Sequence, residues 1–458
     1  MSTNNSPWLK QLARTRPIAR TESINDTDFV IVGGGIAGVT TAYYLLLNTD
    51  KNICLLEGDK IAHGATGHNA GQLVLDFERP LSDLVKQFGF DLVMSSIRDL
   101  EHSWVLVEEI LETIQKDVPM STFFQSVGYT TYDQLIISLE ESFLRKQANL
   151  HSYEVFVKKD IAFKEEDFEK YNSFINFVDD EVVLELLESK DNKYIAVSQT
   201  KAGCGNSALL TEKIIEYLLE NYSERFVLAE NTPVQEVVLF DNNSIIKIPQ
   251  GELKSQKVIL CTNGFENITL TNKVGGDIDT KFHHNVEGYV GYMAAYTDSL
   301  GRNPTALTYY NTQSTNPDDP YFYLTRRPYD LEKNNPKSNL VSVGGPGIWL
   351  PDSTHYQKTN PYPEEIEKSI REFINQTYIH APQDTEYLFM WHGLMGFTKD
   401  YLRLIGYEPC NNTLLYNLGC NGVGLLTSIY GGYRISKILS GQKVEASIFD
   451  PKDNLCKI

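Results

Sequence analysis

The chain has 458 residues, of which 41% are hydrophobic and 22% charged, so it is long enough to form two globular domains. Its formal net charge of −19 argues against nucleic acid as a partner, because a phosphate backbone needs a basic protein surface. No apolar run reaches the roughly 18 residues of a membrane helix, and no apolar leader is present, so we expect neither a membrane span nor secretion. The scattered cysteines lack CxxC spacing, which predicts reduced thiols, no metal site and a cytoplasmic protein.

The N-terminal arm is basic. Residues 1–21 contain Lys10, Arg14, Arg16 and Arg20 and no acidic residue. A similar composition occurs in organelle transit peptides. The interpretation that we favour is a solvated arm that packs on the first domain.

A glycine-rich corner follows the arm. The stretch "DFVIVGGGIAGVTTAYYLLLNTDKNICLLEGDK" predicts a strand over Phe29–Val32, a helix from about Ile36 to Leu47 and a strand over Ile53–Leu56. Between the first strand and the helix, GxGxxG spacing permits a tight turn, close approach of the backbone to a pyrophosphate, and packing of helix on strand. The first helical N–H groups would face the phosphates. The residues in these roles are Gly33, Gly35, Ile36, Ala37 and Gly38.

Two further features select the dinucleotide. Glu57 ends the second strand, where a carboxylate accepts hydrogen bonds from a ribose and would repel the 2′-phosphate of NADP. NAD and FAD remain. The next stretch, "IAHGATGHNAGQLV", is a second glycine-rich segment, and it suits a longer ligand whose far end runs on past the first strand. FAD is that ligand.

Further helices and strands are predicted in the remaining chain. "GNSALLTEKIIEYLLENY" predicts a helix from about Ser207 to Asn221, "TPVQEVVLF" a strand that contains Val234, and "KVILCTNGF" a buried strand. "NTLLYNLGCNGVGLLTSIYGGYRISKILSG" predicts a strand over Thr413–Leu418, a glycine-rich turn and a helix from about Gly424 to Leu439. "VGGPGIW" lacks both a third glycine and a following helix, so we expect a loop there and only one dinucleotide fold in the chain.

In four blocks the chain resembles the FAD-dependent oxidoreductases of the D-amino-acid oxidase superfamily, which includes glycine, sarcosine, dimethylglycine and γ-glutamylputrescine oxidases. The blocks are "VIVGGGIAG", "LLEGDKIAHGATGHNAGQ", "VILCTNG" and "MGFTKDYLRLIG…NLGCNGVGLLTSIYGG". The resemblance implies an α/β fold in which a Rossmann-like FAD-binding domain is joined to a β-sheet substrate domain that roofs the flavin. The FAD-binding domain would comprise residues 1–100, 199–280 and 389–458, and the substrate domain residues 101–198 and 281–388.

The resemblance also implies roles at the cofactor. The residues expected beside the isoalloxazine ring are Gly64, Ala65, Thr66, Gly67, His68, Asn69, Ala70, Gly71 and Gln72. The backbone of Val234 would hold the adenine, and Thr262, Asn263 and Gly264 would pass over the pyrophosphate. Gly393 and Gly396 would lie near the flavin. The last helix would begin at the flavin N1/O2 edge, where its N–H groups stabilise negative charge, through Asn421, Gly422, Val423, Gly424 and Leu425.

His68 raises the question of a covalent flavin. In dimethylglycine and sarcosine dehydrogenases, a histidine at what looks like the same place bonds covalently to the flavin. Members similar to γ-glutamylputrescine oxidase have arginine there and bind FAD noncovalently. Both states stay open for His68, and the noncovalent one is favoured.

The substrate would contact side chains of the roofing sheet. "FFQSVGYTTYD" (Phe123–Asp133) and "NVEGYVGYMAAYT" each predict a strand, while "YFYLTRRP" and "NLVSVGG" predict an antiparallel pair. The aromatic residues of this region include Tyr323 and Trp391. Because strand residues alternate, Arg326 and Arg327 point oppositely, so one of them would reach the cavity as partner of a substrate carboxylate; a surface ion pair is the equal alternative. His392, expected near the flavin, would tune the proton of an amine or serve as a core residue.

The reaction implied is oxidation of a C–N bond in an amino acid or amine, by hydride transfer to flavin N5, followed by hydrolysis of the imine. Dioxygen and an electron carrier are both open as the acceptor, and the oligomeric state is open too. The alternatives are a flavin monooxygenase or hydroxy-acid dehydrogenase of similar architecture, and an FAD-binding module without enzymatic activity.

Overall fold

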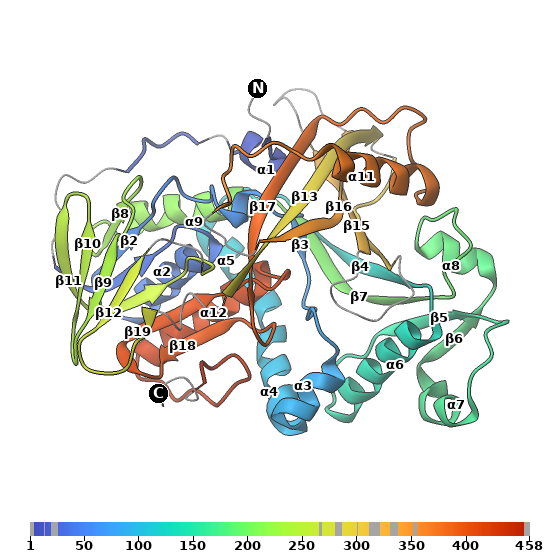
Figure 1. Ribbon diagram of the computed structural model, residues 1–458, viewed down its shortest axis with the longest axis horizontal. Coiled ribbons are helices and arrows are strands. Elements are labelled where there is room, and N and C mark those ends of the chain that lie inside the picture. Colours follow the sequence, from blue (N-terminus) through green and yellow to red (C-terminus); the bar gives the residue numbers. More distant parts are fainter. Residues whose placement is uncertain are drawn as a thin grey trace.

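The computed structural model describes residues 4–12, 14–19, 26–264, 268–279, 286–299, 301–310, 321–329, 338–350 and 355–452. Within these residues it contains two large mixed sheets, one of nine strands and one of ten. Figure 1 shows the nine-stranded sheet on the left and the ten-stranded sheet on the right, with helices between and below them. The α/β fold predicted from the sequence is confirmed.

The nine-stranded sheet begins with the predicted strand–helix–strand unit. Strand β1 pairs in parallel with β2 on one side and β11 on the other, and β11 pairs in parallel with β19. The carboxyl ends of these strands therefore share one edge of the sheet, where α/β proteins bind their ligands. The strands are β1 (Thr27–Val32), β2 (Ile53–Leu56), β8 (Phe226–Ala229), β9 (Glu236–Leu239), β10 (Ser244–Ile248), β11 (Gly251–Leu260), β12 (Thr269–Asn272), β18 (Leu404–Glu408) and β19 (Asn411–Leu418).

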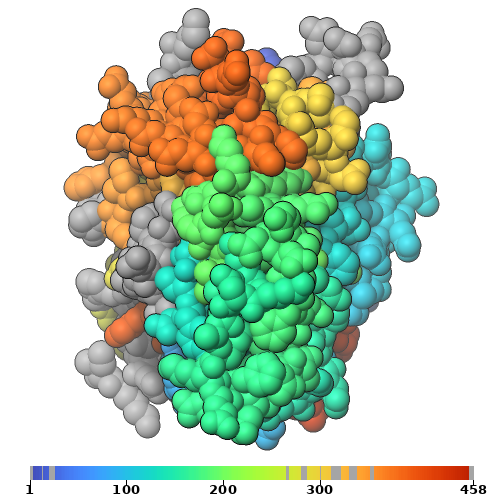
Figure 2. All heavy atoms as spheres, turned by 90° about the vertical axis from the view of Figure 1, so that its right-hand side faces the viewer, coloured from blue at the N-terminus to red at the C-terminus, as the bar shows by residue number. Residues whose placement is uncertain are grey.

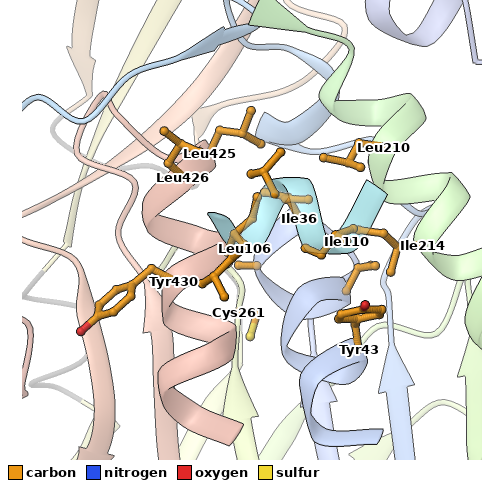
Figure 3. Packing of buried hydrophobic residues seen from close by; sticks show 14 of the residues in the cluster. Ile36, Tyr43, Leu106, Ile110, Leu210, Ile214, Cys261, Leu425, Leu426 and Tyr430 are labelled. Carbon is orange, nitrogen blue, oxygen red and sulfur yellow. The ribbon is translucent and has the colours of Figure 1, made fainter. Parts of the chain in front are cut away.

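One side of this sheet is covered by four helices that pack on one another. Helix α2 is central, and its residues 36–46 are all buried, which explains its nearly continuous apolar sequence. Figure 3 shows Ile36 and Tyr43 of α2 among apolar side chains of α5, α9 and α12. The helices are α2 (Ile36–Asn48), α5 (Ser103–Ile114), α9 (Ser207–Asn221) and α12 (Leu425–Leu439).

The ten-stranded sheet has the order β17-β13-β16-β15-β14-β4-β7-β5-β6, with β3 beside β7. The predicted antiparallel pairing of "YFYLTRRP" with "NLVSVGG" is found between β15 and β16. The strands are β3 (Gln72–Leu73), β4 (Met120–Tyr129), β5 (Glu154–Lys158), β6 (Ile175–Val178), β7 (Ala196–Gly205), β13 (Val286–Ser299), β14 (Thr305–Tyr310), β15 (Tyr321–Tyr329), β16 (Ser338–Leu350) and β17 (Phe389–Thr398). The exact domain limits stay a prediction, and β17 belongs to this sheet although it starts the last predicted FAD-binding segment.

Three local predictions were wrong. "VGGPGIW" is no loop but continues β16, because β13 pairs with it beyond a register shift between Gly291 and Met293. Strand β4 ends at Tyr129, since Thr131 and Gln134 form a capping box that starts helix α6. Val234 precedes strand β9 instead of lying in it, and its side chain packs in the core of the nine-stranded sheet.

The remaining helices surround the two sheets. Helices α6, α7 and α8 lie at one end of the ten-stranded sheet, and in Figure 2 they form the teal and green surface below the orange segment that contains α11. These helices are α3 (Leu81–Phe88), α4 (Phe90–Glu101), α6 (Tyr132–Gln147), α7 (Glu165–Tyr171), α8 (Asp180–Leu186) and α11 (Glu364–Thr377), with short 3₁₀ turns at Ala65–Gly67 and Asn172–Phe174. No helix of the described residues is long and apolar enough to cross a membrane.

The N-terminal arm packs on the protein and is less solvated than expected. Trp8 of helix α1 (Pro7–Lys10) is fully buried, and its Nε1–H donates a 2.6 Å hydrogen bond to the carbonyl oxygen of Asn69. The guanidinium of Arg327 lies over the Trp8 ring at 4.4 Å. Arg14 and Arg16 each form ion pairs with both Glu212 and Glu230, and the four side chains are 13% exposed or less. The arm is therefore tied to the segment expected beside the flavin.

The cysteines largely follow the sequence-based expectation. Cys54, Cys204, Cys261 and Cys420 are free thiols. Cys410 is an exception to the expectation of reduced thiols, since it is disulfide-bonded, while Cys456 lies outside the described residues. No group of three or more potential metal-ligating side chains gathers within the described part of the chain.

Candidate active site

A cavity of about 860 Å³ connects the edge of the nine-stranded sheet with a face of the ten-stranded sheet. Its wall at the first end consists of the glycine corner, Glu57 and the turn after β11. The middle is formed by residues 64–66 and 68–72, Gly393 of β17 and the start of α12. The far end is formed by tyrosines and acidic residues of the roofing sheet and its connections. The volume lies within the range of small-molecule and cofactor sites.

The glycine corner has the geometry that the GxGxxG spacing predicts. Gly33 has a φ of +108°, and a Cβ atom there would lie 2.7 Å from the carbonyl oxygen of Cys261. A Cβ on Gly38 would lie only 1.9 Å from the carbonyl oxygen of Gly33, so this glycine permits helix α2 to pack against the end of β1. A Cβ on Gly35 would approach the Thr66 hydroxyl to 2.9 Å. The corner is thus closely packed, and Gly33 and Gly38 cannot be replaced without movement of the backbone, whereas a Cβ on Gly35 would displace the Thr66 side chain.

Two helices begin at the cavity, α2 after Gly35 and α12 after Gly424, and neither cap residue has a side chain that bonds the first N–H groups. In α2, the Thr66 hydroxyl accepts a 3.0 Å hydrogen bond from the Ile36 N–H instead. Uncapped helix starts carry unpaired donors and a partial positive charge, which attract anions. The cavity therefore has two places suited to negative charge on a ligand.

Glu57 lies at the cavity wall beside the glycine corner. One of its carboxylate oxygens accepts a 2.6 Å hydrogen bond from the Gly34 N–H, and the other accepts a 2.8 Å bond from the Asp59 N–H. Burial raises the pKa of Glu57, and these two N–H groups oppose that rise. Asp59 in turn pairs with Lys358 at 2.8 Å. A carboxylate held in this way is positioned to accept hydrogen bonds from ligand hydroxyl groups.

His68 lines the middle of the cavity. Its Nδ1 lies 2.9 Å from the carbonyl oxygen of Gly64, and burial lowers its pKa to about 4, so the imidazole is neutral at physiological pH. A neutral imidazole that donates from Nδ1 leaves Nε2 as an acceptor. Gly393 of β17 packs on this segment, since a Cβ there would lie 2.6 Å from the His68 carbonyl oxygen.

Most residues predicted to bind FAD line this cavity. They are Gly33, Gly35, Ile36, Ala37, Glu57, Gly64, Ala65, Thr66, His68, Asn69, Ala70, Gly71, Gln72, Thr262, Asn263, Gly393, Gly422, Val423, Gly424 and Leu425. Those that do not line it are Gly38, Gly67, Val234, Gly264, Gly396 and Asn421. Asn421 has a structural function instead, because its side-chain oxygen accepts a 2.8 Å bond from the Thr398 N–H. Contact of the lining residues with FAD stays a prediction.

Of the side chains proposed to act on substrate, only Tyr323 lines the cavity. Trp391 is fully buried and packs edge-on against Trp8. His392 lies in contact with Tyr356 and Tyr292, and its Nε2 is 3.0 Å from the carbonyl oxygen of Asn360. The position of His392 supports the alternative that it is a core residue.

Arg326 and Arg327, the proposed partners of a substrate carboxylate, both have contacts elsewhere in the structure. Arg326 forms an ion pair with Glu188 and a 2.6 Å hydrogen bond to the Tyr378 hydroxyl, on the face of β15 opposite Tyr323. Arg327 shares the face of Tyr323 but lies over Trp8 and donates a 2.5 Å hydrogen bond to Gln11. Neither arginine lines the cavity. The prediction that the two side chains point to opposite faces of the strand was correct, but strand alternation does not indicate which groups each side chain contacts.

Charged residues to which the sequence assigned no binding role complete the cavity. Arg403 lines it beside the glycine corner and donates from Nε and Nη2 to the side-chain and backbone oxygens of Asn417, at 2.6 and 2.9 Å. Its Nη1 has no hydrogen-bond partner among the described residues. Asp76, Glu78 and Glu141 line the cavity as well, and Glu78 lies against the turn before α12, since a Cβ on Gly422 would lie 2.3 Å from a Glu78 carboxylate oxygen.

Comparison with known proteins identifies the family. The family model described as FAD dependent oxidoreductase matches residues 28–438, which is most of the chain. The chain belongs to this family. γ-Glutamylputrescine oxidoreductase of Escherichia coli K12 is 36% identical over 64 residues, a stretch that covers only 14% of this chain and 15% of that relative. A match this short gives no basis for assigning the activity of that relative to this chain.

Solved structures of the FAD dependent oxidoreductase family share the fold. Glycine oxidase from Geobacillus kaustophilus superimposes with a TM-score of 0.65 at 13% identity, covering 94% of this chain and 100% of that one. L-α-Glycerophosphate oxidase from Mycoplasma pneumoniae, solved with FAD bound, has a TM-score of 0.60 at 12% identity and covers 94% and 98% of the two chains. The two neighbours act on different substrate classes, so the likeness shows the fold alone.

The cavity fits the cofactor of the family. At Gly33 and Gly38 a Cβ would collide with backbone, the start of α2 and the Arg403 guanidinium suit the phosphates, Glu57 suits a ribose, and the start of α12 suits negative charge on the flavin. The Thr262 hydroxyl, buried at the cavity wall, has no partner among the described residues and offers a further polar contact.

Proposed function

We propose that this FAD dependent oxidoreductase oxidises a C–N bond of an amine or amino acid. The observation that carries the proposal is the continuity of the cavity from the glycine corner, past His68 and the start of α12, to a tyrosine-rich roof. A dinucleotide at the corner would place its reactive end where the two sheets meet. FAD bound there would supply a two-electron acceptor, which takes a hydride from the carbon next to nitrogen and leaves an imine for hydrolysis by water.

The chain's own residues would then bind the dinucleotide and the amine and orient them toward each other. The glycine corner, Glu57 and Arg403 would hold the dinucleotide, and the start of α12 would stabilise negative charge that develops near its N-terminus. Tyr323 and its neighbours would form an aromatic wall that excludes water and positions the amine. No acid–base side chain is required when the amine binds in its neutral form. The proposal therefore depends on positioning more than on a catalytic dyad.

We propose that the flavin is bound noncovalently. The Nδ1 of His68 is engaged with the Gly64 carbonyl oxygen, which fixes the ring as part of the turn at Ala65–Gly67. Acid precipitation of the purified protein should leave the yellow flavin in the supernatant. Flavin fluorescence that stays with the pellet, and disappears from it in a His68→Ala variant, would show the covalent state instead.

The reaction class can be tested on the protein as purified with its flavin. Under anaerobic conditions, we expect amines or amino acids to bleach the oxidised flavin absorbance band and to yield a carbonyl product and ammonia or a smaller amine. Parallel samples should contain 2-hydroxy acids, glycerol 3-phosphate and NADPH alone. Bleaching by a hydroxy acid or by NADPH, but by none of the amines, would replace the proposal with a hydroxy-acid dehydrogenase or a monooxygenase. Bleaching by none would favour a nonenzymatic FAD-binding module.

A further inference from the structure

The far end of the cavity is acidic. Asp76 and Glu78 lie in the connection between β3 and α3, and Glu141 lies on α6. All three line the cavity, although they come from segments well separated along the chain. Between them stand the tyrosines of β4 and β14, Tyr129 and Tyr310. The wall therefore combines carboxylates with aromatic rings, the two kinds of group that attract organic cations.

These carboxylates are incompletely satisfied by the protein. Asp76 has no hydrogen-bond or ion-pair partner among the described residues, although it lies deep in the structure with accessible surface toward the cavity. Glu78 accepts one 3.1 Å bond from the Tyr321 hydroxyl, and Glu141 accepts one 2.6 Å bond from the Tyr153 hydroxyl. Gln125, which is 3% exposed and also lines the cavity, has an unpartnered side-chain oxygen. The oxygen atoms without a partner at this end are thus hydrogen-bond acceptors, and a ligand that donates hydrogen bonds would satisfy them.

The cations that line the cavity are engaged elsewhere. Lys358 pairs with Asp59, and Arg403 binds Asn417. One further cation, Arg145, does not line the cavity; it attracts both Glu141 and Asp76 from behind the wall, and its ion pair is with Glu101, at 3.2 Å.

The burial of Asp76 and Glu78 is reflected in their titration. Burial, together with the neighbouring Glu141, raises the pKa of Asp76 to about 6. Burial and Asp76 raise the pKa of Glu78 to about 7. Buried carboxylates without partners are costly, and a bound cation would remove that cost.

We propose that the acidic end of the cavity binds a second cationic nitrogen of the substrate, so that the enzyme acts on aliphatic diamines or polyamines. This inference rests on the proposed C–N oxidation and names its substrate class. One nitrogen would lie at the carbon to be oxidised, near residues 64–72, and the other would lie among Asp76, Glu141 and the tyrosines. A substrate with a carboxylate at that end would be repelled, which replaces the earlier expectation of an arginine–carboxylate contact.

The test compares matched substrates on the flavin-loaded enzyme. A homologous series of α,ω-diamines, the alkyl monoamines of equal length and the corresponding ω-amino carboxylates would be mixed anaerobically with it, and the bleaching rate measured against concentration. We expect the best diamine to exceed its monoamine by about tenfold or more in kcat/KM, mainly through KM, and the amino carboxylate to be the poorest. Asp76→Asn and Glu141→Gln should each reduce the preference for the diamine about tenfold.

The control is Asp83→Asn, which removes a similar charge from the exposed face of α3, where Asp83 pairs with Lys86. This variant should retain the diamine preference. If Asp76→Asn loses its flavin, the Glu141→Gln variant and the substrate series on the unchanged enzyme decide the question. Equal efficiency of monoamines and diamines with the unchanged enzyme would overturn the acidic subsite and leave C–N oxidation standing.

A second measurement separates this subsite from the proposed reaction. Diamine and monoamine binding would be titrated by calorimetry and by the change in the absorbance spectrum of oxidised flavin. Tighter binding of the diamine, weakened by Asp76→Asn and unchanged by Asp83→Asn, would support the subsite even if no amine bleached the flavin and the proposed reaction failed. Equal binding of diamine and monoamine would reject it.

Discussion

A Gly38→Ala variant is expected to purify as a folded protein that has lost its flavin. The added Cβ would lie 1.9 Å from the carbonyl oxygen of Gly33, and both atoms are fixed to backbone, so helix α2 must move away from β1 by more than 1 Å. The start of α2 forms part of the cavity wall. A displacement of about 1 Å in a preorganised site costs on the order of a hundredfold, and we expect at least that loss in FAD affinity.

The measurement is the ratio of flavin absorbance to protein absorbance after purification, followed by titration of the apoprotein with FAD. Overpacking should also lower the free energy of unfolding by about 1–3 kcal/mol, which urea unfolding of the apoprotein would detect. Gly301→Ala is the matched control, because a Cβ at this exposed turn meets no atom within 4 Å. A Gly38→Ala protein that retained stoichiometric flavin with unchanged affinity would show that the close approach of helix to strand does not support the site.

An Arg403→Met variant should bind FAD about a hundredfold more weakly, which corresponds to about 3 kcal/mol. Two nitrogens of Arg403 are held by Asn417, while Nη1 is free in the cavity wall. Burial lowers the pKa of this guanidinium, and an anion beside it would oppose that effect. The phosphates of FAD would be that anion, and methionine keeps the apolar stem without the charge.

Titration of each apoprotein with FAD, followed by quenching of flavin fluorescence, gives the dissociation constants. Arg403→Lys should fall between the two, because lysine supplies a charge but cannot reproduce the fork to Asn417. The matched control is Arg434→Met, which removes another buried arginine of the same region, paired with Asp450 and absent from the cavity wall. If Arg403→Met and Arg434→Met weakened FAD binding equally, the loss would reflect general destabilisation, and Arg403 would have no specific contact with the cofactor.

The glycine corner shows why part of the site was predictable from sequence. The roles of Gly33, Gly35 and Gly38 are local: each depends on the backbone path from a strand into the next helix, and three glycines at fixed spacing are the mark of that path. Strand and helix limits near the corner agreed with the prediction to within two residues. The small residues between Gly64 and Gln72 were predictable for a similar reason, since close backbone approach excludes larger side chains.

The substrate end was not predictable in the same way. Arg326 forms an ion pair with Glu188, which is far away in the sequence, and therefore does not enter the cavity. Strand alternation places Arg326 and Arg327 on opposite faces but does not indicate such partners. Asp76, Glu78 and Glu141 carry no shared motif. They become a cluster only because the loop after β3 and helix α6 fold against the same sheet.

By itself, the amino-acid sequence of this protein determined the α/β class, the dinucleotide corner and its carboxylate, because those features depend on neighbouring residues and on hydrogen bonding of the local backbone. Only the tertiary structure decided which charged side chains line the cavity, that the N-terminal arm packs on Asn69 through Trp8, and that Arg403 lies in the cavity wall. The physical reason is that burial and pairing of a charge are set by partners brought from distant parts of the chain.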